Sequence, residues 1–193
     1  MVEPAPGDKS ALRAEARERR RIMTQDAREA SADALTTQLQ QLTEQLGASS
    51  IGCYLSTLDE PPTRDFIDWA IASGIDVLVP VSRDDGLMDW ARCDQQGESL
   101  DVLGMPIPTS ELLGPMAIDS ADALFVPAAL VDQSGMRLGW GRGYFDRMLG
   151  SMAKRPPVFA VVYDHEVIAD VPQEPHDQGV DGAVTPSGII RFG

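Results

Sequence analysis

Hydrophobic and polar positions follow two different patterns along this chain, one before residue 48 and one after residue 50. In the first part, four leucines recur at the spacing of one helix face: Leu35, Leu39, Leu42 and Leu46. This spacing predicts a helix over about residues 26–46, which Gly47 would end. A preceding helix is predicted over about residues 8–23, where an aspartate or a serine can cap the first turn.

After residue 50 the apolar runs are short and continuous, and turn residues separate them. They predict strands at about residues 50–56, 76–81, 88–93, 123–126 and 158–163. Helices are predicted at 63–73 and 143–152, and the proline- and glycine-rich residues 103–115 are predicted to form a loop. Continuous apolar strands between helices are typical of a largely parallel sheet that helices cover on both faces. The predicted fold is therefore α/β, a single three-layer, Rossmann-like α/β/α domain over residues 1–193, with residues 1–7 disordered.

Composition and charge narrow the class of protein. Apolar residues make up 43% of the 193 residues, and no apolar run approaches the roughly 20 residues of a membrane-spanning helix. The first residues are polar and acidic, unlike a secretory signal, so a cytoplasmic protein with no membrane partner is expected. The net charge of −14 disfavours nucleic acid as a partner.

The predicted N-terminal helix departs from this acidity. Residues 8–28 hold seven basic and four acidic side chains. Lys9, Arg13 and Arg17 lie four residues apart, so they share one helix face. Such a face can bind an anionic ligand, although ordinary i,i+4 ion pairs on a solvated surface explain several of these charges.

The segment Arg137–Arg147 (RLGWGRGYFDR) is the most informative of the chain. Its three alternating glycines precede the first turns of a predicted helix, and such a loop can present backbone N–H groups to phosphate. It is not a Walker A loop, since no Gly-Lys-Ser/Thr follows, nor a dinucleotide fingerprint, since no strand-like run enters Gly139 directly. The glycine spacing alone fits a phosphate site or a tight turn. The flanking arginines and Asp146 favour phosphate.

The longer run Phe125–Arg147 closely resembles the core motif of the 5-formyltetrahydrofolate cyclo-ligase family, also called methenyltetrahydrofolate synthetase, which reads approximately VPxLAFDxxGxRLGxGxGYYDR. Shorter matches follow in order at Lys9–Arg13, Tyr54–Thr63, Met88–Trp90 and Pro175–Thr185. One departure is Ile107, where the family commonly has a glutamate. Glu111 could supply that carboxylate instead.

The resemblance implies ATP-dependent closure of 5-formyltetrahydrofolate to 5,10-methenyltetrahydrofolate, with ADP and phosphate released and Mg²⁺ required. The ATP-binding residues that it implies are Lys9, Arg13, Arg137, Gly139, Trp140, Gly141, Arg142, Gly143, Tyr144 and Arg147. The implied folate-binding residues are Tyr54, Leu55, Glu60, Met88, Trp90, Trp140 and Tyr144, with the Glu60 carboxylate on the pterin N–H groups. Asp146 and Asp181 would hold Mg²⁺, directly or through water.

Other interpretations stay open for the residues and for the protein. Taken alone, Lys9 and Arg13 fit surface charge, Tyr54 and Met88 fit a core, and Asp181 fits a turn. The chain could be another ATP-dependent ligase on the same scaffold, or a catalytically silent nucleotide- or folate-binding protein. Joint retention of the basic residues and the two aspartates disfavours the silent protein. We expect a monomer whose partners are ATP and 5-formyltetrahydrofolate.

Overall fold

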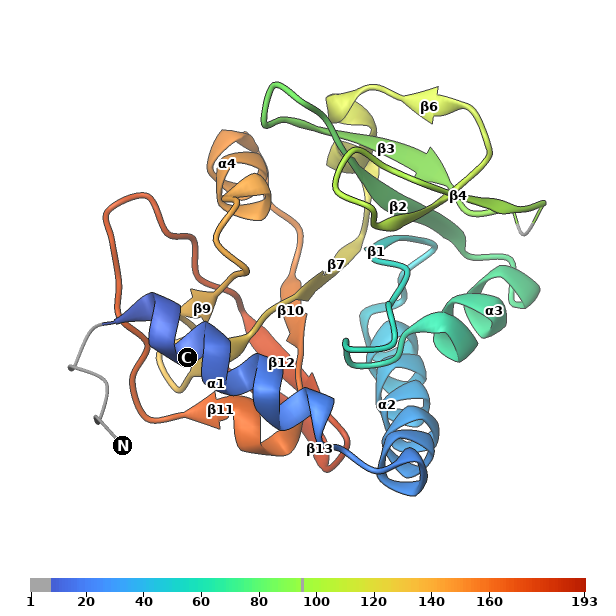
Figure 1. Cartoon of the computed structure of the whole chain (residues 1–193). Helices are drawn as coiled ribbons and strands as arrows, with labels where there is room; N and C mark the ends of the chain where they lie inside the picture. Colours follow the sequence, from blue (N-terminus) through green and yellow to red (C-terminus); the bar gives the residue numbers. More distant parts are fainter. Residues whose placement is uncertain (1–7, 95) are drawn as a thin grey trace.

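The computed structural model describes residues 8–94 and 96–193, so the expectation of disorder at residues 1–7 lies outside the described residues. An eight-stranded central sheet forms the middle of the molecule (Figure 1). Its strands, in spatial order, are β13 (Gly188–Arg191), β12 (Gly182–Thr185), β10 (Val158–Val161), β7 (Ala123–Pro127), β1 (Ser50–Cys53), β2 (Asp76–Ser82), β3 (Met88–Arg92) and β6 (Leu112–Leu113).

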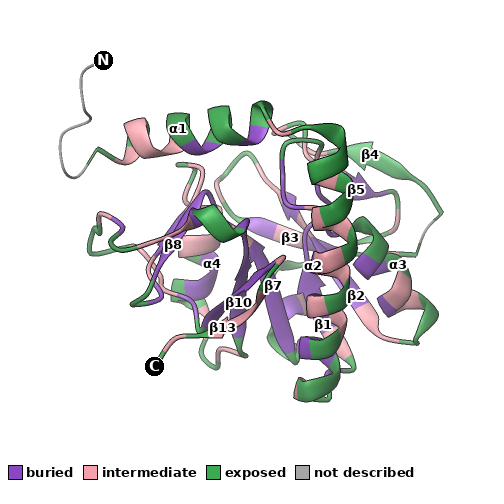
Figure 2. Cartoon of the chain, turned by 90° about the horizontal axis from the view of Figure 1, so that it is seen from below, coloured by how far each residue is buried: buried purple, intermediate pink, exposed green. Residues whose placement is uncertain are grey.

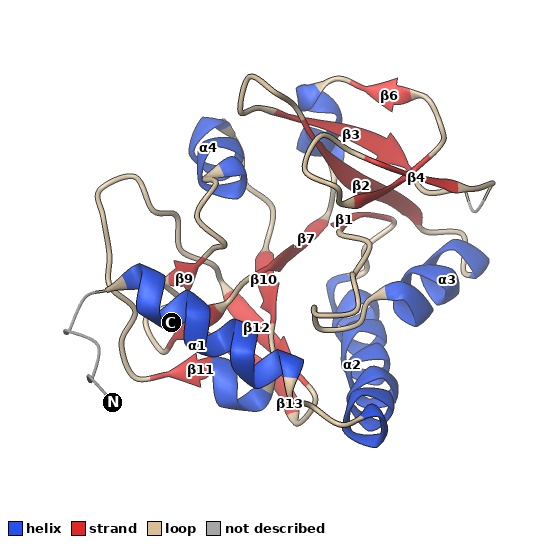
Figure 3. Cartoon of the chain, in the orientation of Figure 1, coloured by secondary structure: helices blue, strands red, loops and turns tan. Residues whose placement is uncertain are grey.

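The five inner strands of this sheet are parallel. β1 pairs with β2 and β7, and β10 pairs with β7 and β12. The outer strands are antiparallel, since β13 pairs with β12, and β3 pairs with β2 and β6. The sheet is therefore mixed but largely parallel, which confirms the predicted α/β class. The helices flank it (Figure 3).

Four α-helices and two 3-10 helices surround the sheet within the described part of the chain. They are α1 (Lys9–Arg21), α2 (Gln25–Leu46), α3 (Arg64–Ala72), α4 (Tyr144–Ser151), η1 (Pro115–Ser120) and η2 (Asp164–Glu166). The Asp8 carboxylate caps α1 by accepting from two backbone N–H groups. Gly47 ends α2 in a left-handed conformation with φ of 62°. Both predicted N-terminal helices are confirmed.

Alternate residues of the inner strands face opposite layers. Ala123 and Phe125 of β7 pack with residues of α2 and α3. Leu124 and Val126 of the same strand pack with residues of η1 and α4 on the other face. Burial on both faces is the reason that these strands read as continuous apolar runs. Figure 2 shows the inner strands buried and the outer turns of α2 exposed.

Two small sheets lie beside the central one. β8 (Leu130–Asp132) pairs with β11 (Val167–Ile168) and with β9 (Arg137–Leu138), and α1 packs on this sheet through Ala16. The second small sheet pairs β4 (Glu98–Leu100) with β5 (Pro106–Pro108).

Several local predictions were wrong. Residues 103–115, predicted as a loop, contain β5 and β6, and the first predicted strand ends at residue 53 rather than 56. A strand does enter Gly139 directly, since β9 occupies the two residues before it. Ile107 lies buried with Val81 and Ala91, so an apolar side chain suits the position where the family commonly has a glutamate.

Candidate active site

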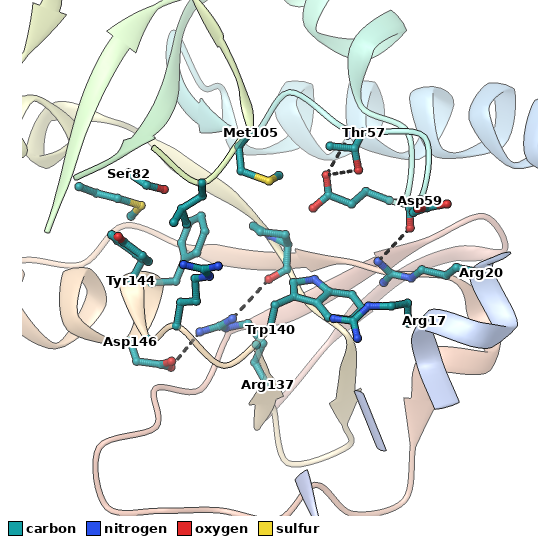
Figure 4. Close-up of a pocket in the computed structure, with 18 residues that line it drawn as sticks. Arg17, Arg20, Thr57, Asp59, Ser82, Met105, Arg137, Trp140, Tyr144 and Asp146 are labelled. Carbon is teal, nitrogen blue, oxygen red and sulfur yellow. Dashed lines mark hydrogen bonds and ion pairs between the residues drawn. The ribbon is translucent and has the colours of Figure 1, made fainter. Parts of the chain in front are cut away.

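The glycine segment lies where three inner strands of the sheet end. A cavity of about 350 Å³ opens there, and it is lined by Ser82 at the end of β2 and Pro127 at the end of β7. Thr57 and Glu60 line it from the segment after β1. Ligands of parallel α/β sheets bind beyond the carboxyl ends of the strands. We call this cavity the inner cavity (Figure 4).

Each glycine of the loop has an arginine guanidinium packed against it. A Cβ at Gly139 would lie 2.8 Å from Nη1 of Arg137, and one at Gly143 would lie 2.9 Å from Nη1 of Arg147. A Cβ at Gly141 would lie 3.3 Å from Cζ of Arg13. The glycines therefore admit three cations beside the loop as well as a close backbone approach.

Arg137 lies at the floor of the inner cavity, with only 3% of its surface exposed. Its Nη2 donates to Oδ1 of Asp146 at 2.8 Å, and its Nη1 donates to the carbonyl oxygen of Pro127 at 3.3 Å. Its buried Nε has no hydrogen-bond partner among the described residues. Burial lowers the pKa of this guanidinium, and the Asp146 carboxylate opposes that shift.

Glu60 lies on the opposite wall of the inner cavity and is 9% exposed. The backbone N–H and the hydroxyl of Thr57 both donate to its Oε2, at 2.9 and 3.1 Å. Burial raises the pKa of the Glu60 carboxyl, while the bonds from Thr57 and the positive charge of Arg20 act against that rise. Because the Thr57 bonds end on Oε2, Oε1 is left to accept from a ligand.

Aromatic and apolar side chains complete the inner cavity. The predicted residues Met88, Trp140 and Tyr144 line it together with Leu103, Met105 and Phe145. Figure 4 shows Tyr144 and Asp146 to the left of Trp140, and Met105 above them. The Tyr144 hydroxyl donates to the carbonyl oxygen of Arg83 at 2.6 Å, which fixes the ring. A flat ligand with a polar edge facing Glu60 suits such walls.

A second, wider cavity of about 500 Å³ lies on the outer side of the glycine loop. It is lined by Gly141, Arg142, Gly143, Asp146, Arg147, Gly150, Ser151, His176 and Gln178. We call it the outer cavity. Arg142, Gly143 and Asp146 line both cavities, so the two share one wall.

Lys9 and Arg13 lie close to this loop but make different contacts. Nε of Arg13 donates to the carbonyl oxygen of Gly139 at 2.7 Å. Nζ of Lys9 donates instead to Asp177 at 2.6 Å and to Glu174 at 2.7 Å, and it lines neither cavity. The backbone N–H of Gln178, the next residue after Asp177, donates to Asp146 at 3.2 Å.

The structure corrects three of the expected site residues. Tyr54 is 4% exposed, and its hydroxyl donates to the carbonyl oxygen of Pro61 at 2.9 Å. Trp90 is 1% exposed and packs in the core with Leu124. Both predictions as cavity walls were wrong, because these aromatic side chains fill the core. Leu55 lines another surface depression, beside Arg64 and Glu98, and not the inner cavity.

Asp181 is a fourth correction, at the expected Mg²⁺ site. It directly precedes β12, at the end of the sheet opposite the cavities, and its Oδ2 accepts from the backbone N–H of Val158 at 2.8 Å. The structure therefore does not bring Asp181 to Asp146, and the predicted pair of Mg²⁺ ligands was wrong. One group of three metal-binding side chains was found among the described residues, Glu174, His176 and Asp177. Two of them already bind Lys9.

The sequence interpretation missed Arg20 and Glu166, and it placed Arg17 on the basic face of the predicted helix without including it among the site residues. Arg17 and Arg20 line the inner cavity from α1, and Glu166 pairs with Arg20 from 146 residues away. Helical spacing placed Arg17 beside Arg13, but no local pattern indicates a partner so distant in the chain.

The comparisons with known proteins agree over nearly the whole chain. A sequence profile of the 5-formyltetrahydrofolate cyclo-ligase family matches residues 5–186. The chain is 33% identical to a 5-formyltetrahydrofolate cyclo-ligase of Mycolicibacterium smegmatis, over 97% of this chain and 99% of that protein. It is 25% identical to one of Escherichia coli, over 91% and 99% of the two chains.

Solved structures agree in fold. The structure of 5,10-methenyltetrahydrofolate synthetase from Aquifex aeolicus superposes with a TM-score of 0.80 at 22% identity, covering 95% of this chain and 92% of that one. The corresponding protein of Mycoplasma pneumoniae gives a TM-score of 0.74 at 18% identity, over 92% and 98%. In the described ranges, no helix has the length and apolar character that crossing a membrane requires.

Proposed function

Because the chain belongs to the 5-formyltetrahydrofolate cyclo-ligase family and is an ATP-dependent enzyme of that activity, we propose that its reaction takes place at the wall shared by the inner and outer cavities. The folate would lie in the inner cavity and the nucleotide in the outer cavity. The observation that carries this proposal is that Arg142, Gly143 and Asp146 line both. A phosphoryl group that moves from one ligand to the other must cross such a wall.

The inner cavity suits a pterin. Glu60 offers a carboxylate oxygen to the amino and ring N–H groups of the pterin, since a carboxylate accepts from a paired donor edge. The rings of Trp140 and Tyr144 and the thioether of Met88 offer apolar walls. These four side chains are the proposed pterin contacts, and Tyr54, Leu55 and Trp90 are not among them.

The outer cavity suits phosphates. The N-terminus of α4 follows Gly143, whose φ of 70° turns the chain into the helix, and backbone N–H groups at this end attract anions. Arg13, Arg142 and Arg147 add positive charge beside the glycines. Lys9 remains a proposed phosphate ligand, one that would have to leave Asp177 and Glu174 when ATP enters.

Asp146 fits Mg²⁺ better than Asp181. Mg²⁺ commonly binds one or two carboxylates together with substrate phosphates, and Asp146 is a carboxylate at the shared wall. When bound there, the ion would neutralise part of the charge of the triphosphate. We propose Asp146 as the protein's carboxylate ligand, with the remaining ligands supplied by phosphate and water.

The chemistry needs charge stabilisation and positioning more than a covalent catalyst. The formyl oxygen of the folate would attack the γ-phosphorus, and ADP would leave. The N10 nitrogen would then attack the formyl carbon, and phosphate and the N10 proton would leave. Arg137 lies at the floor of the inner cavity, and its buried Nε has no hydrogen-bond partner in the described part of the chain. It can therefore stabilise the negative charge that develops on the transferred phosphoryl oxygens.

Steady-state kinetics on variants of the two cavities test this arrangement. The formation of the methenyl product is followed by its near-ultraviolet absorbance. Trp140→Ala should raise the KM for 5-formyltetrahydrofolate, and Arg147→Ala should raise the KM for ATP. If Trp140→Ala changed only the KM for ATP and Arg147→Ala only that for folate, the assignment would be reversed.

We also propose that the protein acts as a cytoplasmic monomer. Residues of one chain line both cavities, so a second copy is not needed to complete them. Light scattering at assay concentrations measures the mass directly, and a dimer would overturn this part of the proposal.

A further inference from the structure

A buried ion pair lies directly behind the proposed folate cavity. Arg20, on α1, is 1% exposed, and Glu166, in η2, is 0% exposed. Nε of Arg20 donates to Oε1 of Glu166 at 2.6 Å, and its Nη2 donates to Oε2 at 2.9 Å. The pair is therefore bidentate, which fixes the plane of the guanidinium.

The remaining donors of Arg20 reach two other segments. Its Nη2 also donates to the carbonyl oxygen of Ala128 at 2.7 Å, just after β7. Its Nη1 contacts the carbonyl oxygen of Asp59 at 3.5 Å, in the segment that carries Glu60. Figure 4 shows Arg20 below Asp59 and beside Arg17 and Trp140. One side chain thus links α1, η2, the end of β7 and the segment 57–60.

Arg20 also contacts the aromatic wall of the inner cavity. Its Cζ lies 5.0 Å from the centre of the Trp140 ring, and Cζ of Arg17 lies 5.3 Å from the same ring. These distances fit cation–π contacts. The indole Nε1 of Trp140 is buried and has no hydrogen-bond partner among the described residues. The described hydrogen bonds therefore leave the indole unfixed, and ring packing must hold it.

Arg28 extends the same linkage from α2. Its Nη1 donates to the carbonyl oxygen of Leu58 at 2.5 Å, and its Nη2 donates to the carbonyl oxygen of Arg20. The segment 57–60 is thereby held to both N-terminal helices.

We propose that Arg20 is a positioning residue for the folate, one that holds the Trp140 ring and the segment bearing Glu60 at the separation that the pterin requires. This rests on the proposed placement of folate in the inner cavity. Stability alone does not explain the pair, because a well-packed apolar pair is often as stabilising as a buried ion pair. An apolar pair, however, could not bind the carbonyl oxygens of Ala128 and Asp59.

The test compares Arg20 with its exposed neighbour. The double variant Arg20→Met/Glu166→Gln removes both charges, so no buried charge is left unpaired, and a glutamine oxygen can still accept from the Tyr163 N–H that now donates to Glu166 at 2.8 Å. Arg21→Met is the matched control, since Arg21 lies on the helix surface and pairs there with Glu18. Circular dichroism verifies that both variants are folded.

We expect the double variant to raise the KM for 5-formyltetrahydrofolate roughly tenfold, as misplacement of substrate-positioning groups does. The KM for ATP should stay within twofold. The indole N–H resonance of Trp140, one of three tryptophans and identified by its loss in Trp140→Phe, should shift in ¹⁵N NMR spectra. Arg21→Met should change neither KM and should not shift the Trp140 resonance.

Two results would overturn the inference. One is an unchanged folate KM and an unmoved Trp140 resonance in the folded double variant, and the other is an equal rise in both KM values. Glu60→Gln distinguishes the possible failures. If it raises the folate KM and the double variant does not, Arg20 is not a positioning residue and the folate site stands. If neither variant raises it, the placement of folate is wrong as well.

If the double variant fails to fold, Arg20→Lys tests the positioning role instead. Lysine keeps the charge but lacks the planar fork that binds Glu166 and two carbonyl oxygens together. Arg20→Lys should raise the folate KM, and it should shift the Trp140 resonance in the direction expected of the double variant. A folded Arg20→Lys protein with wild-type values for both would overturn the inference.

Discussion

Two buried arginines face the same cavity, and their surroundings differ. Arg20 meets Glu166 in a bidentate pair and bonds to the carbonyl oxygen of Ala128. Arg137 bonds to Asp146 through one nitrogen and more weakly to Pro127 through another, and its buried Nε is left without a partner in the described structure. Most of the N–H donors of Arg20 therefore have acceptors within the protein, whereas Arg137 has a buried donor to offer to a ligand.

This difference separates positioning from catalysis. An arginine whose donors are used within the protein can hold walls in place but has little left to offer a ligand. Burial of Arg137 costs solvation, and yet its Nε has no acceptor among the described residues. An anionic ligand would repay that cost. We therefore expect the two arginines to respond differently to substitution.

Arg137→Ala gives the largest expected effect. The variant should lose about 10²–10³-fold in kcat, the range for removing one donor that stabilises transition-state charge. ATP-dependent formation of the methenyl product measures the loss, and circular dichroism verifies the fold. Asp146→Ala should lose a similar factor in kcat. Near-normal rates in Arg137→Ala and Asp146→Ala would contradict a catalytic role for Arg137.

Gly139→Ala tests the same guanidinium without removing it. The new methyl group would lie 2.8 Å from Nη1 of Arg137, so the guanidinium must move. We expect kcat/KM to fall at least about tenfold, since a misplacement of about 1 Å in a positioned group can cost about 10²-fold in rate. Gly114→Ala is the control, because the φ of −64° at Gly114 suits any residue and no described atom lies within 4 Å of the new methyl group. Equal activities of the two variants would contradict a role for the position of Arg137.

Glu60→Gln examines the wall that Arg20 supports. Loss of a hydrogen bond to a charged group, about 1.5–3 kcal/mol, predicts a rise in the folate KM of at least about tenfold. Burial raises the pKa of Glu60, so the wild-type carboxyl becomes protonated at a higher pH than an exposed glutamate. The wild-type folate KM should therefore rise as the pH falls through that pKa. Glutamine has no such proton, and a pH dependence that survived in Glu60→Gln would have another source.

Asp181→Asn should have the smallest effect. Asp181 lies at the opposite end of the sheet from both arginines and bonds to the backbone of Val158, and an asparagine oxygen can accept the same hydrogen bond. The Mg²⁺ concentration for half-maximal rate should change less than about twofold, within the small effects usual for surface substitutions. Asp146→Asn, at the shared wall, is the comparison. If Asp181→Asn changed the Mg²⁺ concentration for half-maximal rate as much as Asp146→Asn does, both aspartates would have to be Mg²⁺ ligands.

Periodicity and resemblance predicted the long helices and four of the five inner strands, β1, β2, β7 and β10, because burial on both faces of β7 or β10 leaves a continuous apolar run. They missed β12 and β13, whose four-residue strands begin with glycine and depend on pairing with each other. Trp90 and Tyr54 were misassigned for a related reason. The sequence indicates that an aromatic residue is present, but only packing decides whether it faces a cavity or the core.

The glycine loop and Asp146 could be predicted because their residues lie together in one continuous segment of the sequence, Arg137–Arg147. The Arg20–Glu166 pair could not, since its members are 146 residues apart and either could be an ordinary surface charge in sequence. Asp181 shows the opposite error. It matches a family motif in sequence, but the strand that follows it begins at the wrong end of the sheet.

The long separations of the α1 contacts bear on how the enzyme emerges from the ribosome. The helix α1 is made before the segments that it contacts, since its partners Gly139, Glu166 and Asp177 lie 126, 146 and 168 residues later. The N-terminal part of a chain is made first, so α1 lacks these partners until the segments that carry them have been made. A nascent chain halted before residue 166 would have a glycine loop and no completed folate wall. The enzyme should therefore become competent to bind folate only after residue 166 has left the ribosome.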